Sequence, residues 1–241
     1  MATKRHTFIV EHLDPELEEW QSLEYKCIHQ ECKDSGAKFI LSGLKDSTAV
    51  HKQLSLPADA LQEQSVESLY STPEERQRVC LLDPKGEKDI NPEDGDLFDV
   101  FLFGGILGDE PPRDRTGELR NKGFVGRRLG PEQMTTDTAA RVTRIVVQQR
   151  SAYYLFMVRH SASWLTMHAE RLDEIDFVDR PDIALPADDD GGKDGAHPSE
   201  SVSMPFKYVK GKDGKPIMPE EFKGMVKLLV EDMDKGIGDL L

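Results

Sequence analysis

The chain has 241 residues, and its shares of hydrophobic residues (37%) and charged residues (32%) are those of a folded protein with one large domain, or with one domain and an appendage. It carries 45 acidic and 31 basic residues, which gives a formal net charge of −14. An acidic surface repels phosphates, so this charge argues against non-specific nucleic-acid binding. It favours a basic partner, although solubility alone also accounts for it.

The cysteines and the N-terminal segment bear on the cellular compartment. Cys27, Cys32 and Cys80 lack the even count of a disulfide framework and the spacing of a zinc site, so we predict free thiols and no bound metal. The apolar run within MATKRHTFIVEHLD is too short for a signal peptide, and no apolar segment is long enough to span a membrane. We therefore expect a cytoplasmic protein without membrane segments.

Residues 6–43 predict a strand, a helix and a second strand. His6–His12 (HTFIVEH) has the β-branched and aromatic residues of a strand. Asp14 as the N-cap and Pro15 as the first helical residue predict a helix that ends at Gly36. The segment AKFILSG then follows as a strand, and this order favours a parallel sheet with a right-handed crossover. The expected helix face carries Leu17, Trp20, Glu24, Cys27 and Ile28.

Three more strands are predicted after residues 44–77, a polar stretch in which we expect one or two helices with loops. Arg78–Asp83 and Phe98–Gly105 are continuous apolar runs, as in strands that are buried on both faces of a sheet. Gly123–Gly130 is a weaker strand. Their order predicts an α/β fold with a mostly parallel sheet.

A helix follows the last of these strands, in the segment PEQMTTDTAARVTRIVVQQR. Its N-terminus is capped by Thr135, Thr136 or Asp137, all of which carry a side-chain oxygen that can accept a backbone N–H. The predicted face consists of Met134, Thr138, Val142, Ile145, Val146 and Gln149.

The composition divides the chain into a domain over residues 1–187, a flexible linker over 188–200 (DDDGGKDGAHPSE) and an appendage over 201–241. The appendage contains KGKDGK, which is typical of a hairpin turn, and then an amphipathic helix around Glu220–Lys235. We expect the appendage to fold back on the core.

Each of the three central strands ends in a loop that is rich in Gly, Pro and Asp. In an open parallel sheet, loops at the carboxyl ends of strands are where a ligand binds, although such residues also simply make turns. The sequence has neither G-x-G-x-x-G nor the phosphate-binding P-loop motif. The ligand therefore need not be a phosphate, and backbone amides from several loops would equally hold a purine edge.

The segment LFGGILGDEPPRDRT places three acidic and two basic residues directly after glycines. One interpretation is a salt-bridged turn stiffened by Pro111 and Pro112. The other is a carboxylate pocket for a cationic substrate group, because a carboxylate binds a guanidinium through paired, charge-assisted hydrogen bonds. The basic residues either neutralise the acids or hold a ligand carboxylate. The acids are Asp109, Glu110 and Asp114, and the bases are Arg113 and Arg115.

At these residues the chain resembles a known family. RVCLLDP, FGGILGDEPPRDRTGELR and RRLGPEQMTTDTA together resemble the SPOUT methyltransferases, and within them a fungal branch that methylates arginine in a protein of the small ribosomal subunit. The likeness covers most of the chain, from FIVEHL near the start to MPFKYV and GKPIMPE near the end.

The resemblance implies a mostly parallel α/β sheet flanked by helices, a trefoil knot in its C-terminal part, and an appendage that helps to shape the substrate site of a monomer. It implies S-adenosylmethionine (SAM) bound in the knot and a basic ribosomal protein as substrate, without stable nucleic-acid binding. It assigns cofactor binding to Leu82, Asp83, Pro84, Gly104, Gly105, Ile106, Gly108, Leu129, Gly130, Gln133, Met134, Thr135 and Thr136. Orientation of the guanidinium and acceptance of its proton fall to Asp109, Glu110 or Asp114, with Asp109 foremost because it adjoins the glycine loop, and Arg113 and Arg115 would contact the substrate.

One segment departs from the family pattern, which passes almost directly from VQQRSA to ERLDEIDFVDRP. Here Tyr153–Ala169 (YYLFMVRHSASWLTMHA) intervenes, and its apolar and aromatic composition is unlike that of a surface insertion. It is either a retained intron translated in frame, which we favour, or a genuine segment that packs on the core or on a partner.

Three functions are compatible with these observations. The first, which we predict, is methylation of an arginine in a basic ribosomal protein, and the acidic net charge agrees with it. The second is RNA methylation by the same fold, for which basic clusters such as GRR are too sparse to promise a groove. The third is a non-enzymatic module that binds SAM or a ribosomal partner, and the intact loops argue against it.

Overall fold

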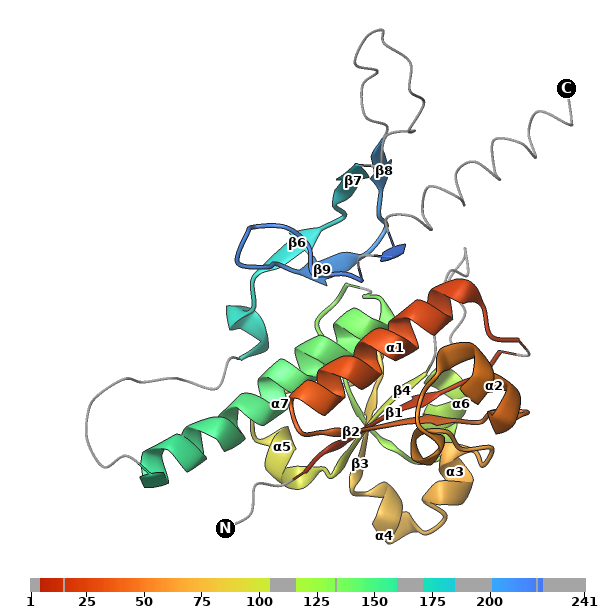
Figure 1. The fold of residues 1–241 in the computed structure, drawn as a ribbon. Helices are drawn as coiled ribbons and strands as arrows, with labels where there is room; N and C mark the ends of the chain where they lie inside the picture. Colours follow the sequence, from red (N-terminus) through yellow and green to blue (C-terminus); the bar gives the residue numbers. More distant parts are fainter. Residues whose placement is uncertain are drawn as a thin grey trace, which may run out of the picture.

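The structure, a computed structural model, is shown as a ribbon in Figure 1. It describes residues 5–14, 16–104, 116–132, 134–159, 171–184, 201–219 and 221–222, with the helical backbone alone over 149–159.

Five parallel strands form the central sheet, in the order β2-β1-β4-β3-β5. Every neighbouring pair is parallel and in register; Phe8 of β1, for example, lies opposite Phe39 of β2 and Phe101 of β4. This confirms the predicted α/β fold and parallel sheet, whereas the knot stays a prediction. The strands are β1 Thr7–Glu11, β2 Lys38–Ser42, β3 Val79–Leu82, β4 Val100–Gly104 and β5 Val125–Arg127.

Helices cover both faces of this sheet. The two long helices, α1 and α7, lie side by side across one face together with α2 and α5, and α3 and α6 cover the other (Figure 1). No helix in the described ranges has both the length and the hydropathy to span a membrane. The helices are α1 Glu19–Asp34, α2 Ser47–Leu54, α3 Val66–Leu69, α4 Pro73–Arg76, α5 Asp94–Leu97, α6 Thr116–Asn121 and α7 Thr136–Arg159, with 3₁₀ turns at Ala58–Ala60 and Leu172–Glu174.

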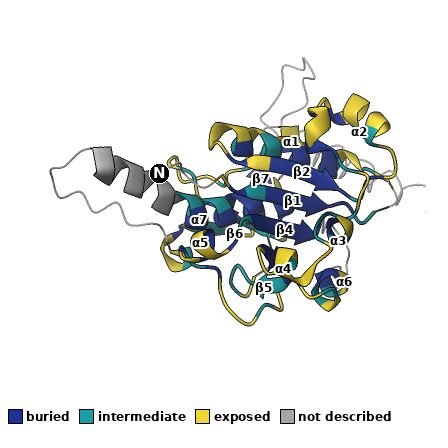
Figure 2. Cartoon of the chain, turned by 90° about the horizontal axis from the view of Figure 1, so that it is seen from below, coloured by how far each residue is buried: buried dark blue, intermediate teal, exposed yellow. Residues whose placement is uncertain are grey.

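Strands β1 to β4 are buried on both faces, as Figure 2 shows mostly in dark blue, because successive side chains point to opposite sides of a sheet, whereas β5 is half-buried. Phe8, Phe101 and the residues in phase with them pack under α1 and α7. Ile9, Leu102 and their neighbours pack against α3 and α6. This explains why the strand sequences read as continuous apolar runs. All three cysteines are free thiols, as predicted, and Cys80 lies in the middle of β3.

The start of α1 differs from the prediction. The helix begins at Glu19, with Glu18 as its N-cap, and the Glu18 backbone N–H donates to the Gln21 side-chain oxygen at 3.0 Å. Asp14, the expected cap, instead accepts a hydrogen bond from the Gln21 side-chain amide at 2.6 Å. The Asp14 carboxylate thus stabilises the capping residue Gln21 from outside the helix. Pro15 lies outside the described residues.

Helix α7 begins at Thr136, as expected, and the Thr135 carbonyl accepts the Ala139 N–H at 2.9 Å. Val142 and Val146 on the predicted face are fully buried under the sheet. The helical backbone continues to Arg159 and so includes the start of the unusual segment 153–169, of which residues 160–169 lie outside the described part of the chain.

The appendage contributes β8 and β9, each of which pairs antiparallel with a strand from the end of the predicted domain, and both pairs lie beside α1 and α7 (Figure 1). In each pair, one strand precedes the predicted linker and one follows it. The KGKDGK turn is confirmed, because Gly211 N–H donates to the Lys215 carbonyl at 2.7 Å. The linker 188–200 and all but residues 221–222 of the predicted helix 220–235 lie outside the described ranges, so the domain boundaries stay predictions. The pairs are β6 Phe177–Asp179 with β9 Lys207–Val209, and β7 Asp182–Ala184 with β8 Ser201–Ser203.

Candidate functional site

A pocket with an empty volume of about 550 Å³, part of it open to solvent, lies at the carboxyl ends of β3, β4 and β5. The loops after β3 and β5 and the carboxyl end of β4 meet here, together with the first turn of α7. Within the described part of the chain, the pocket is lined by Leu82, Asp83, Pro84, Phe103, Gly104, Leu129, Gly130, Glu132, Met134, Thr136 and Ala139.

Most of the predicted cofactor residues that can be located line this pocket. Thr135 is the exception, because it is 1% exposed and donates its hydroxyl to Thr138 at 2.8 Å. Gly105, Ile106, Gly108, Gln133, Asp109, Glu110, Arg113, Asp114 and Arg115 lie outside the described residues.

Three lining residues were not predicted: Phe103, Glu132 and Ala139. Phe103 is the last apolar residue of β4 before Gly104, and Ala139 lies one helical turn after Thr136, so periodicity alone would have placed both beside predicted residues. Glu132 has no such signal, because its place depends on a long-range ion pair described below.

The first loop is held by the Asp83 carboxylate. Asp83 is 2% exposed and accepts hydrogen bonds from Arg120 Nη2 at 2.8 Å, from the Thr116 hydroxyl at 3.0 Å and from the Lys85 backbone N–H at 3.0 Å. Burial by itself raises the pKa of the Asp83 carboxyl, but these hydrogen bonds outweigh it and leave the pKa below its ordinary value. The carboxylate is thus committed to joining β3 to α6, the helix that follows β4.

The β5 strand is tied to the same loop by close backbone contacts. The Asp83 N–H donates to the Arg127 carbonyl at 2.8 Å, and a Cβ on Gly86 would lie 2.8 Å from the Arg127 carbonyl carbon, so only glycine fits. The Arg127 guanidinium turns inward to the fully buried Asp94 at 3.0 Å and lies over the Phe98 ring. These contacts fix the end of β5, from which the third loop begins.

The third loop is held from outside by the appendage. Lys207 of β9 forms an isolated β-bridge with Met134, and its ammonium is 2.9 Å from the Glu132 carboxylate. The same ammonium lies 4.1 Å from the centre of the Phe177 ring. Gly130 adopts a φ of +85°, the left-handed conformation that glycine permits. Two pocket-lining residues therefore depend on β9 for their position.

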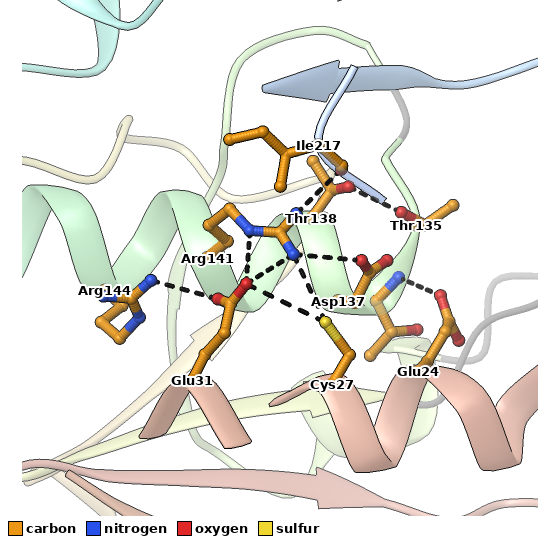
Figure 3. A network of polar contacts seen from close by, with 10 residues as sticks. Glu24, Cys27, Glu31, Thr135, Asp137, Thr138, Arg141, Arg144 and Ile217 are labelled. Atoms are coloured by element: carbon orange, nitrogen blue, oxygen red, sulfur yellow. Dashed lines mark hydrogen bonds and ion pairs between the residues drawn. The ribbon is translucent and has the colours of Figure 1, made fainter. Parts of the chain in front are cut away.

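The first turn of α7 is held from the opposite side by α1 (Figure 3). The Thr136 N–H donates to Glu24 Oε1 at 2.9 Å, which satisfies one of the free N–H groups at the helix N-terminus. Next to it, the Arg141 guanidinium lies 2.6 Å from Glu31 and 3.5 Å from Asp137. Burial, reinforced by the nearby Asp137, raises the pKa of the Glu24 carboxyl well above its ordinary value.

The chain is similar to known proteins over almost its whole length. Residues 7–236 match the family model described as protein arginine N-methyltransferase SFM1-like. Over 248 residues, the chain is 36% identical to the protein arginine N-methyltransferase SFM1 of Saccharomyces cerevisiae (strain ATCC 204508 / S288c), an alignment that covers 97% of this chain and 99% of the yeast protein.

Two crystal structures of the yeast arginine methyltransferase SFM1 are similar to this fold, both at 33% sequence identity. The complex with SAH has a TM-score of 0.68 and covers 91% of this chain and 94% of the other. The complex with SAM has a TM-score of 0.69 and covers 92% of this chain and 90% of the other.

The Asp83 network predicts a pH-dependent stability. In Asp83→Asn the buried charge-assisted hydrogen bonds are lost, and we expect the free energy of unfolding at pH 7 to fall by about 2 kcal/mol. Because the folded-state pKa of Asp83 is lowered, the wild type has this advantage above the ordinary Asp pKa of about 3.9 and loses it as the pH falls further, through the folded-state value. Urea denaturation between pH 3 and pH 8 measures both quantities.

Asp99→Asn is the matched control, because Asp99 makes an equally short pair with Arg78 at 2.8 Å on the exposed surface. We expect it to change stability by less than about 1 kcal/mol. Equal losses for the two variants, or a loss at Asp83 that does not depend on pH, would contradict the interpretation of Asp83.

Proposed function

The chain belongs to the SFM1-like family of protein arginine N-methyltransferases, and from this membership we propose that it transfers a methyl group from SAM to an arginine side chain of a small-subunit ribosomal protein. One observation carries the proposal: the loops after β3 and β5 and the carboxyl end of β4 line one pocket, in a chain whose yeast relative has been crystallised with SAM. Such loops at the carboxyl ends of parallel strands are where ligands bind in this class of fold.

The residues that line the pocket fit the proposed cofactor. Leu82, Phe103 and Leu129 offer apolar surface to a purine. Gly104 and Gly130 expose backbone amides and carbonyls without a Cβ in the way, which suits the hydrogen-bonding edge of the base. Thr136 and Glu132 would supply a hydroxyl and a carboxylate for the ribose hydroxyls or the ammonium group of the cofactor.

When bound, the cofactor supplies an electrophilic methyl group on its sulfonium; a guanidinium nitrogen takes the methyl and gives up a proton, which leaves S-adenosylhomocysteine and methylarginine. Arginine is protonated at any working pH, so the protein must orient the guanidinium and accept that proton. We propose Asp109, Glu110 and Asp114 for these roles. Asp109 comes first, because it follows the glycine segment that begins at Gly104. Holding the two reactants in line would supply much of the acceleration.

The substrate side of the proposal is supported by charge. The net charge of −14 attracts a basic protein, and ribosomal proteins are basic because they bind RNA. The described lining of the pocket contains Asp83 and Glu132 but neither Lys nor Arg, which disfavours an RNA backbone beside it. We further propose that the protein is cytoplasmic. We also propose that it is a monomer, because the chain's own appendage packs on α1 through Trp20, whose ring stacks on Phe222 at 4.1 Å.

The function is tested with radiolabelled SAM. The protein is incubated with separated small-subunit ribosomal proteins and, in parallel, with ribosomal RNA. We expect label on one basic protein, released as methylarginine after acid hydrolysis. Label on RNA alone would favour RNA methylation, and binding of SAM without transfer to either fraction would favour a non-enzymatic module.

Filling the pocket predicts a selective loss of cofactor affinity. Ala139→Leu adds three carbons to the wall, so the dissociation constant for S-adenosylhomocysteine, measured by calorimetry, should rise at least about tenfold. Ala49→Leu, on the exposed side of α2, is the control and should leave that constant unchanged. Undiminished affinity in Ala139→Leu would place the cofactor elsewhere.

The role proposed for Asp109 predicts a defect in turnover. Asp109→Asn keeps the size of the side chain but removes the proton acceptor, and we expect kcat to fall about 100-fold. The affinity for S-adenosylhomocysteine should change little. Asp213→Asn, in the exposed turn after β9, serves as the control. If Asp109→Asn keeps the full kcat, Asp109 is not the proton acceptor, and Glu110 or Asp114 becomes the candidate for that role.

A further inference from the structure

Buried polar atoms without hydrogen-bond partners gather behind the first turn of α7. They are Glu24 Oε2 and Trp20 Nε1 from α1, both carboxylate oxygens of Asp137 from α7, and the hydroxyl of Tyr208 from β9. Glu24 and Tyr208 are 0% exposed and Asp137 is 1% exposed. The Tyr208 hydroxyl is near enough to both carboxyls for their charges to raise its pKa further, after burial. Three separate elements thus direct polar atoms to one buried place.

The charges at this place do not balance. Glu31 forms ion pairs with both nearby cations, because Arg141 lies 2.6 Å from its carboxylate and Arg144 lies 3.1 Å from it. Arg141 reaches Asp137 only at 3.5 Å, and Glu24 has no ion pair with any described residue. Three carboxyls therefore face two guanidinium groups, and a buried carboxylate without a cation is costly.

A purely structural role accounts for only part of this arrangement. Glu24 Oε1 accepts the Thr136 N–H and so caps α7. That contact needs one oxygen of one neutral side chain, and a glutamine would supply it. The Trp20 side chain stands beside Glu24, and the Thr135 hydroxyl and Thr138 N–H stand beside Asp137. None of them is in hydrogen-bond geometry with Glu24 Oε2 or with either oxygen of Asp137. Unpartnered buried acceptors beside a pocket indicate a site that is built for donors.

The ligand that matches these atoms is a guanidinium. It carries five N–H donors and no acceptor, and it binds carboxylates through paired hydrogen bonds. Two carboxyls and a phenol oxygen offer it several acceptors at once. The place also adjoins the cofactor pocket, because Thr136 lines that pocket and donates its N–H to Glu24.

We propose that Glu24, Asp137 and Tyr208 form the binding site for the substrate arginine, with its guanidinium held between the two carboxylates. This inference rests on the proposed methyltransferase function. Tyr208 belongs to the appendage and all three side chains are buried, so the substrate reaches them when β9 moves away from α1. The appendage is then part of the arginine site as well as of the cofactor pocket.

The test uses Glu24→Gln, which keeps an oxygen for the Thr136 N–H and removes only the ability to ionise. We expect kcat/KM for small-subunit ribosomal protein to fall about 100-fold, because a desolvated charge pair is lost. The dissociation constant for S-adenosylhomocysteine should change less than about threefold. The melting temperature should stay equal or rise, because glutamine accepts the Thr136 N–H without placing an ionisable acid in the interior. Asp137→Asn should behave in the same way.

Glu11→Gln is the matched control. Glu11 is a glutamate at the end of β1 that is 4% exposed and also accepts a backbone N–H, from Val66 at 3.0 Å. It should keep kcat/KM within about threefold of the wild type. If the wild type is active and both Glu24→Gln and Asp137→Asn methylate as well as it does, the arginine site is elsewhere. An equal loss of cofactor affinity in both variants would also overturn the proposal. That result would mean that Glu24 and Asp137 only hold the start of α7 in place.

Binding separates this inference from the proposed function. If the wild type transfers no methyl group to arginine, the proposed function fails, and calorimetry with agmatine, an alkyl guanidinium, then decides about the site. Binding to the wild-type complex with S-adenosylhomocysteine that is lost in Glu24→Gln supports the site. Equal binding to both proteins, or no binding to either, overturns it.

Discussion

Five parallel strands bring their carboxyl ends to one edge of a sheet, and this constraint positions everything that the chain offers to a ligand. The order β2-β1-β4-β3-β5 places β3 between β4 and β5, so the carboxyl ends of these three strands become neighbours although they lie at residues 82, 104 and 127. Because helices cover both faces of the sheet, the open edge is where backbone groups remain available. The pocket is a consequence of that topology, and the side chains that line it adapt the pocket to its ligand.

Two long-range contacts then fix the third wall of the pocket. From one side, Glu24 of α1 accepts the Thr136 N–H at the start of α7. From the other, Lys207 of β9 pairs with Glu132 and bridges to Met134. The loop between β5 and α7 is thus held by a helix that begins near residue 19 and by a strand near residue 208. An arrangement of this kind gives precision to a segment that would otherwise be the least constrained part of the site.

Much of the fold and part of the site can be predicted from the sequence, because they depend on local patterns. Buried parallel strands appear as continuous apolar runs, and Asp83, Gly104 and Gly130 stand directly at the ends of these runs or just beyond them. The predicted start of α1 was wrong because Asp14 has the residue type of a cap, yet its carboxylate accepts a hydrogen bond from the side chain of Gln21 in the first turn of α1. Residue type indicates the ability to cap, whereas the partner is decided by the path of the chain.

The remaining features of the site depend on contacts between distant parts of the chain. Asp83 was expected to bind the cofactor, yet its carboxylate is engaged by Arg120, which lies 37 residues further on. Glu24 was placed on the face of α1 that packs inward, as it is, but nothing in the helical pattern indicates that Thr136 would be its partner. Pairs at such separations leave no periodic trace in a single sequence.

The link between Lys207 and the Glu132–Met134 loop has a thermodynamic consequence. Two processes that act on the same segment must influence each other equally in both directions. If a ligand in the pocket favours one arrangement of this loop, it also favours the docked position of β9, and undocking of β9 must weaken the hold on that ligand by the same factor. Release of the cofactor product and undocking of the appendage would then be coupled steps of one catalytic cycle. The Lys207 ammonium would link the two steps.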